Sequence, residues 1–104
     1  MCSDTLMSRV LYVYDCKAAR ARNARRVAFT KELYGYVYTW KTKKGLKQRR
    51  KPGLIDRCPG STAISDSAIL VPREHKASFD DLFSRYKDIL HTYIFQVDEY
   101  YEEL

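Results

Sequence analysis

The alternation of apolar and polar residues along the chain predicts a sheet of four strands. The first strand is aliphatic or aromatic on both faces and ends at Asp15, which is typical of a central, largely buried strand. In the second strand, aromatic rings occupy every other position, so one face is strongly aromatic. In the third, Asp66 interrupts an apolar face and predicts a bulge or a break. The four strands are expected at residues 9–14, 36–42, 62–71 and 91–97.

Two helices are expected between these strands. The first runs from about Arg22 to Leu33 and is closed by Gly35, a residue suited to the left-handed position that often follows a helix. The second is expected to be capped by Ser78, with Asp81 three residues later in an arrangement like a capping box. Its apolar residues recur at intervals of three and four, and this stripe is expected to pack on the sheet: Phe79, Leu82, Phe83, Tyr86, Ile89 and Leu90.

The order strand, helix, strand, strand, helix, strand predicts an α+β, ferredoxin-like βαββαβ sandwich in a single domain. Such a fold has an antiparallel sheet with two helices on one face. Here a long basic hairpin is expected between the middle strands, with Leu54 and Ile55 returning it to the sheet. Outside the regular elements, we expect residues 1–8 to be disordered, residues 43–53 to form a basic loop and residues 98–104 to form an acidic tail.

Charge is distributed unevenly along the chain. The net charge is +6, but residues 1–73 carry 16 basic and 5 acidic side chains, while residues 74–104 carry 3 basic and 8 acidic ones. Clustered positive charge indicates a face that binds a polyanion, whereas scattered charge would indicate only a solvated surface. Three cysteines without C-x-x-C spacing indicate reduced thiols rather than a zinc site or a disulfide framework.

The segment from Tyr34 to Lys51 joins aromatic rings to dense positive charge. Rings stack on bases and cations hold phosphates, so this combination indicates nucleic-acid binding. Aromatic residues on a strand more often pack in a core, and these rings are free for bases only if their face lies outside the helical layer. The residues predicted to bind nucleic acid are Arg20, Arg22, Arg25, Arg26, Tyr38, Trp40, Lys43, Lys44, Lys47, Arg49, Arg50 and Lys51.

Asp15 has two interpretations. A carboxylate at the rim of a sheet can bind a metal ion or take part in catalysis, and the same residue can be a turn residue or an N-cap before the next helix. The two histidines, His75 and His91, are isolated in the sequence. No histidine pair with metal-ligand spacing and no Gly-rich phosphate loop accompanies them, so any catalytic prediction depends on Asp15 alone.

Three segments carry a resemblance to a known family. They are Val10 to Asp15 (VLYVYD), the Arg-rich segment from Arg20 to Leu33 that closes on Tyr34-Gly35, and Ser65 to Pro72 (SDSAILVP), which is followed by a helix. In this order they resemble the small CRISPR-associated spacer-acquisition proteins, once described as metal-dependent endonucleases. The last segment is also similar to a related domain of some transcriptional repressors.

This resemblance implies a ferredoxin-like homodimer. In it, Asp15 of each subunit approaches its mate and the pair shares a divalent metal, with Ser67 on the neighbouring strand. Paired carboxylates holding Mg²⁺ would polarise a phosphate and activate water. The long basic hairpin from Lys41 to Cys58 departs from the family, whose members turn tightly at this point.

Together these patterns predict a small basic protein that grips the phosphate backbone of DNA or RNA through an Arg-rich helix and a Lys/Arg-rich hairpin loop, without a cofactor. The alternatives are an endonuclease-like homodimer that uses Mg²⁺ at Asp15 and an adaptor subunit of a ribonucleoprotein. Single strands and duplexes both fit the pattern. No apolar run approaches the roughly 20 residues that span a membrane and no signal peptide precedes the first strand, so we expect a cytoplasmic protein.

Overall fold

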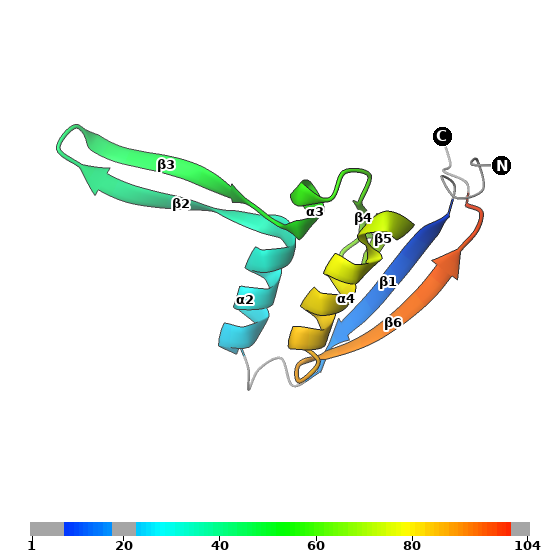
Figure 1. The fold of residues 1–104 in the computed structure, drawn as a ribbon. Helices are drawn as coiled ribbons and strands as arrows, with labels where there is room; N and C mark the ends of the chain where they lie inside the picture. Colours follow the sequence, from blue (N-terminus) through cyan, green and yellow to red (C-terminus); the bar gives the residue numbers. More distant parts are fainter. Residues whose placement is uncertain (1–7, 18–22, 101–104) are drawn as a thin grey trace.

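The chain folds into an antiparallel four-stranded sheet, a separate two-stranded hairpin and few helices, in a computed structural model that describes residues 8–17 and 23–100 (Figure 1). It is therefore an α+β protein. The strands are β1 (Arg9–Cys16), β2 (Gly35–Thr42), β3 (Gly45–Pro52), β4 (Thr62–Ser65), β5 (Ala68–Pro72) and β6 (Leu90–Val97). The helices are α2 (Asn23–Tyr34), α3 (Leu54–Arg57), the 3-10 turn η1 (Arg73–His75) and α4 (Lys76–Arg85).

The four-stranded sheet has the order β4-β5-β1-β6, and every neighbouring pair is antiparallel. β1 lies inside the sheet, so that Tyr12 is paired with Ile69 on one side and Ile94 on the other. This position agrees with the continuous apolar character of β1, because a strand with a neighbour on each side is among the most buried of a sheet.

One face of this sheet packs against α2 and α4. Val10, Tyr12 and Tyr14 of β1 point to that side and all three are buried. Tyr14 meets Phe29 of α2 edge-on with ring centroids 5.4 Å apart, and Tyr12 stacks on Phe83 of α4 at 5.1 Å. Such aromatic pairs add about 0.5–1.5 kcal/mol each beyond the burial of their area. Every second side chain of β1 and the apolar side chains of α4 therefore pack together in one aromatic core.

The two helices are also joined by charged side chains at the surface. Arg25 donates to both carboxylate oxygens of Asp88, at 2.6 and 3.2 Å, and its guanidinium lies 4.4 Å from the centre of the Tyr86 ring. Glu32 of α2 accepts hydrogen bonds from Arg85, at 2.8 Å, and from the hydroxyl of Tyr86. These contacts fix how α2 lies against α4, and α2 leads directly into β2.

The other face of the sheet is open in the described part of the chain. Leu11 and Val13 stand on it, with Phe95 and Tyr93 of β6 directly opposite them. Both rings are 50% exposed. The face away from the helices is therefore open, and its exposed rings come from β6 instead of from the aromatic strand predicted at 36–42.

The prediction that residues 36–42 form a strand of the main sheet is wrong. β2 pairs along its whole length with β3, from Gly35 opposite Pro52 to Thr42 opposite Gly45, and neither strand joins the four-stranded sheet. The expected long basic hairpin is present, but the basic loop predicted at 43–53 is too long, since residues 45–52 form a strand and only Lys43 and Lys44 form the turn. Backbone pairing with β2 holds β3 extended although its side chains are nearly all polar.

The segment 62–71, predicted as one strand, supplies two strands of the sheet, β4 and β5, so that the sheet still has four strands. The predicted break near Asp66 is confirmed, because Asp66 and Ser67 form a turn between β4 and β5. Leu54 and Ile55 belong to the short helix α3, so the prediction that they return to the sheet is wrong. α4 begins at Lys76, directly after η1, which places Ser78 inside the helix instead of at its cap.

Other expectations concern the ends and the membrane. Residues 1–7 and 101–104 lie outside the described residues, whereas Ser8 is described and is buried. Residues 98–100 of the predicted acidic tail follow β6 without forming a helix or strand. None of the helices in the described ranges has the length and apolar composition that crossing a bilayer requires.

Candidate nucleic-acid interface

The β2–β3 hairpin projects from the body of the protein (Figure 1), and the whole molecule, hairpin included, measures 58 Å along its longest axis. At the root of the hairpin, the backbones of Gly35 and Gly53 lie close together. Gly35 has a φ of +83°, and a side chain on Gly53 would meet the backbone of Gly35, Leu33 and Tyr34 at 2.3–2.4 Å. Only glycine fits at Gly53, because the obstructing atoms belong to the backbone and cannot rotate away. The hairpin therefore leaves the body in a direction set by packed backbone.

An ion pair reinforces the root. Arg50 donates to the carboxylate of Asp56 at 2.9 Å and to the carbonyl oxygen of Tyr34 at 2.8 Å. The backbone N–H of Gly53 donates to the same Asp56 oxygen at 2.9 Å. This N–H and then the Arg50 guanidinium hold the pKa of Asp56 below its ordinary value. Asp56 thus stays charged and ties β3 to α3.

The register of the hairpin places aromatic rings and cations side by side. Residues directly opposite in an antiparallel pair have their side chains on the same face. Three rings of β2 therefore share a face with three cations of β3, in the pairs Tyr36 with Lys51, Tyr38 with Arg49, and Trp40 with Lys47. We call the surface formed by these six residues the ring face.

The rings of the ring face form a ladder. The centroids of Tyr36 and Tyr38 lie 6.1 Å apart, and those of Tyr38 and Trp40 lie 5.7 Å apart with the planes inclined by 29°. Tyr38 is 40% exposed and Trp40 is 42% exposed. The ammonium of Lys31, from α2, lies 4.9 Å from the centre of the Tyr36 ring. The free aromatic surface therefore belongs to Tyr38 and Trp40, away from the root.

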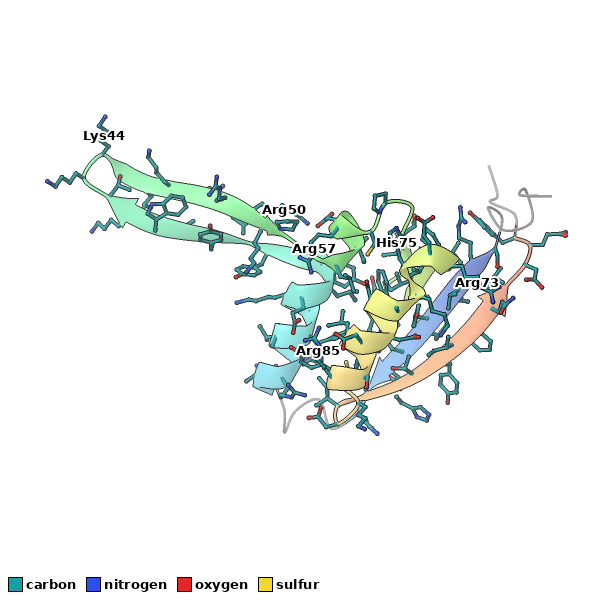
Figure 2. The ribbon with its side chains drawn as sticks, in the orientation of Figure 1. Lys44, Arg50, Arg57, Arg73, His75 and Arg85 are labelled. Carbon is teal, nitrogen blue, oxygen red and sulfur yellow. The ribbon has the colours of Figure 1, made fainter. Side chains whose placement is uncertain are left out.

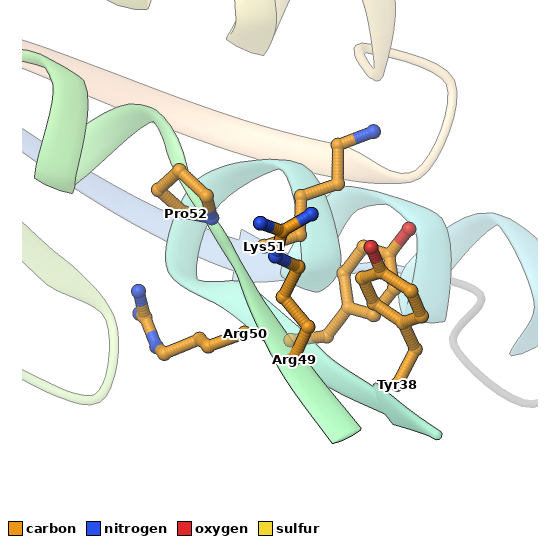
Figure 3. A pocket seen from close by; sticks show the side chains of 6 residues that line it. Tyr38, Arg49, Arg50, Lys51 and Pro52 are labelled. Atoms are coloured by element: carbon orange, nitrogen blue, oxygen red, sulfur yellow. The ribbon is translucent and has the colours of Figure 1, made fainter. Parts of the chain in front are cut away.

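The ring face is hollowed near the root. An open pocket of about 440 Å³ is lined there by Tyr36, Tyr38, Arg49, Arg50, Lys51 and Pro52. Figure 3 shows Arg50 pointing away from Tyr38, in keeping with its ion pair to Asp56. A second pocket, of about 390 Å³, adjoins it through Tyr36, Lys51 and Pro52, and Lys31 and Arg57 also line it. Both hollows are bordered by cations.

The cations of the ring face are available to a ligand. Of the ion pairs formed within residues 8–17 and 23–100, none includes Lys47, Arg49 or Lys51. The hairpin itself holds seven basic residues and no acidic one. Their mutual repulsion is a cost that an external polyanion would relieve.

The opposite face of the hairpin has a different character. It presents Val37, Thr39 and Lys41 of β2 with Arg50, Gln48 and Leu46 of β3 opposite them. Its apolar side chains are Val37 and Leu46, of which Leu46 is 77% exposed, and neither belongs to the ladder of rings. At the far tip, Lys43 and Lys44 form the turn, and Figure 2 shows Lys44 at the point most distant from the body. The hairpin is thus two-sided, with rings on one side only.

Other predicted binding residues lie elsewhere. Arg20 and Arg22 lie outside the described residues. Arg25 is engaged with Asp88 and with the carbonyl oxygen of Arg85, at 2.8 Å, and so serves the contact between helices. Arg26 is exposed on α2, where its guanidinium donates to Asn23 at 3.3 Å. Lys31 is a basic residue of the predicted helix but is not among the residues predicted to bind nucleic acid, because its place over Tyr36 depends on how α2 lies against the hairpin root.

Asp15 is exposed at the end of β1, directly opposite His91 of β6. The described residues contain no group of three or more His, Cys, Asp or Glu side chains that could hold a metal ion. One chain therefore offers Asp15 with His91 as a neighbour. The endonuclease and the homodimer, which need a second carboxylate from a partner subunit, stay predictions.

The chain was compared with family models, with curated proteins and with solved structures, and none of the three comparisons found a match.

Proposed function

We propose that this protein binds nucleic acid through the ring face of its hairpin. The observation that carries the proposal is the register of the hairpin, which sets Tyr38 opposite Arg49 and Trp40 opposite Lys47 on one exposed surface. Stacking on rings and neutralising phosphates are the two interactions that bind nucleic acid without reading its sequence. A core role for these rings is excluded by their exposure and by the position of the hairpin outside the sheet.

The rest of the fold supports this role as a scaffold. When the hairpin strands β2 and β3, the four-residue helix α3 and the 3-10 turn η1 are set aside, the elements run β1, α2, β4, β5, α4, β6, and the sheet order is β4-β5-β1-β6. This order supports a ferredoxin-like βαββαβ sandwich into which the hairpin is inserted after the first helix. The insertion leaves the core complete. In this proposal the body holds the hairpin and the hairpin binds the ligand.

Titration of the purified protein with labelled single- and double-stranded DNA and RNA tests the proposal. With three phosphate contacts from Lys47, Arg49 and Lys51, affinity is expected to fall roughly 20- to 40-fold between 50 and 200 mM salt. Replacing these three residues by Ala is expected to lower affinity about 100-fold, if each charged contact contributes about 1 kcal/mol.

The chain offers a control with the same loss of charge. Lys41, Lys43 and Lys44 lie on the opposite face or at the tip of the hairpin. Replacing them by Ala removes three charges but leaves the ring face whole, so the affinity should fall much less. Equal losses in the two triple variants would mean that net charge alone attracts the ligand. No binding of any nucleic acid at 50 mM salt would refute the proposed function and favour the adaptor.

A further inference from the structure

The free rings of the ring face need bases whose flat surfaces are accessible. Tyr38 and Trp40 are stacked at 5.7 Å and form one inclined platform at the surface. In a duplex the bases stack on each other and present only their edges in the grooves. An unpaired base has a free face that can lie on an aromatic ring. The platform therefore fits a nucleic acid whose bases are unpaired.

The spacing of the cations points the same way. Lys47, Arg49 and Lys51 alternate along β3, so successive members are about 6.8 Å apart at the usual rise of a strand. In a stacked helical strand, neighbouring phosphates advance by only about 3.4 Å along the axis, because the rest of each backbone step winds around it. A straight row of cations therefore follows successive phosphates best when the backbone runs straight beside it instead of winding around an axis. The bases of a strand laid out in this way need not stack on each other and are free to lie on the rings across the hairpin.

A duplex could be read in another way, because a two-stranded ribbon can enter the major groove. Such a ribbon recognises base edges through side chains that donate or accept hydrogen bonds. On this hairpin the amide of Gln48 lies on the opposite face, beside Thr39. The ring face carries the donors Lys47 and Arg49 on β3, but the whole of its β2 half is occupied by the aromatic ladder, whose flat rings suit stacking. The distribution of side chains favours stacking.

Building on the proposed function, we infer that the ligand of the ring face is an extended single strand of nucleic acid. Its bases stack on Tyr38 and Trp40 of β2, and its phosphates lie along Lys47, Arg49 and Lys51 of β3. The pocket of about 440 Å³ at Tyr36, Tyr38, Arg49 and Lys51 receives the nucleotide nearest the body. Its size is within the range of about 300–1,000 Å³ that is usual for small-ligand sites.

The protein contains a built-in reporter for this geometry. Trp40 is the single tryptophan of the chain and stands on the platform. A base stacked on its indole is expected to quench its fluorescence, whereas a duplex held by its phosphates leaves it unchanged. The test is a fluorescence titration of the whole protein at 50 mM salt with unstructured oligothymidylate and oligouridylate of 12 nucleotides, and with a blunt 12-base-pair duplex. A labelled copy of each ligand gives the affinity independently by anisotropy.

The inference predicts that both single strands quench Trp40 and bind at least about tenfold more tightly than the duplex. Replacing Tyr38 by Leu keeps an apolar side chain but removes a ring, and should weaken single-strand binding about tenfold, while duplex binding changes less than twofold. Phe95→Leu is the matched control, because it also removes a half-exposed ring but does so on the open face of the sheet. Circular dichroism establishes that each variant is folded.

The outcomes separate this inference from the proposed function. Duplex binding equal to or tighter than single-strand binding would overturn the inference and leave the proposed function standing. Single-strand binding without quenching, and unaffected by Tyr38→Leu, would also overturn it, since the rings would then take no part. If no ligand binds in the anisotropy measurement, the proposed function fails, and the inference fails with it.

Discussion

Individual side chains in this protein take their role from the partner that the fold brings to them. Arg25, Arg50 and Arg49 carry the same guanidinium, yet the first joins two helices, the second fixes the root of the hairpin and the third stands beside an exposed ring. Sequence alone treats all three as candidates for phosphate binding. The positions of Asp88 and Asp56 distinguish them: Arg25 and Arg50 pair with these carboxylates, whereas Arg49 stays available to a ligand.

Glu32 gives a prediction at the residue scale. Partial burial alone would raise the pKa of Glu32, but hydrogen bonds from Tyr86 and Arg85 outweigh burial and lower the pKa below its ordinary value of 4.5. A carboxylate with a lowered pKa stabilises the folded state above the ordinary value, and this contribution is lost as the pH falls through the folded pKa.

Glu32→Gln should therefore lower the free energy of unfolding by about 0.5–1 kcal/mol at pH 7, a modest amount because the side chain is 40% exposed. The difference from the parent protein should shrink once the pH falls below 4.5. Urea unfolding at a series of pH values measures it. Asp81→Asn is the control, since it removes a more exposed partner of Arg85 and should cost less. If the difference in the free energy of unfolding between variant and parent stayed constant with pH, the charge of Glu32 would not be its cause.

At the scale of elements, the hairpin is a unit that stands beside the core instead of within it. Its strands pair only with each other, and the core consists of residues from β1, β5, α2, α4 and the segments around them. A shortened hairpin should therefore leave the body folded. Tyr38 and Arg49 are directly opposite, so residues 39–48 can be replaced by the two-residue turn Asn-Gly.

This shortened protein is expected to keep its melting temperature within a few degrees and to lose most of its affinity for nucleic acid, because Trp40 and Lys47 are gone. Thermal unfolding followed by circular dichroism and an anisotropy titration measure the two properties. A large fall in melting temperature would show that the distal hairpin supports the body, contrary to its position outside the core.

The elements also show how far the sequence could predict the structure. β1 was recognisable because it is a short, continuous apolar run, and α4 because its apolar residues recur at the helical spacing without interruption. β3 was not, since the run from Gly45 to Pro52 has one large apolar side chain and is held by its pairing with β2. The residues of the proposed interface, Tyr38, Trp40, Lys47, Arg49 and Lys51, could be named from composition. Their arrangement on one face could not, because it depends on the register of the hairpin.

For the whole molecule, the hairpin carries the net charge. It holds seven of the 19 basic residues and none of the 13 acidic ones, so the remainder of the chain is close to neutral. A concentrated charge on a projecting arm attracts a polyanion over a distance of about one Debye length, roughly 8–10 Å at physiological salt. Long-range attraction mainly raises the association rate, whereas close contacts mainly set the dissociation rate.

The two contributions should separate in kinetic measurements. Replacing Lys41, Lys43 and Lys44 by Ala is expected to slow association several-fold at 50 mM salt and to leave dissociation nearly unchanged, because these residues lie off the ring face. Trp40→Leu is expected to do the reverse and speed dissociation about tenfold. Stopped-flow anisotropy with labelled oligothymidylate measures both rates. Equal effects of the two variants on association would contradict this division.

The separate pairing of β2 and β3 has a consequence for solubility. A two-stranded hairpin that joins no sheet has two free edges, and exposed edges of this kind can pair with the strands of another molecule. The cations along the hairpin oppose such pairing by repelling a second copy, and salt screens that repulsion at the same concentrations at which it weakens the hold on phosphate. Ionic strength therefore acts twice on this protein. If the protein binds nucleic acid as proposed, salt releases the ligand and, at the same time, weakens the repulsion that keeps the emptied hairpins apart.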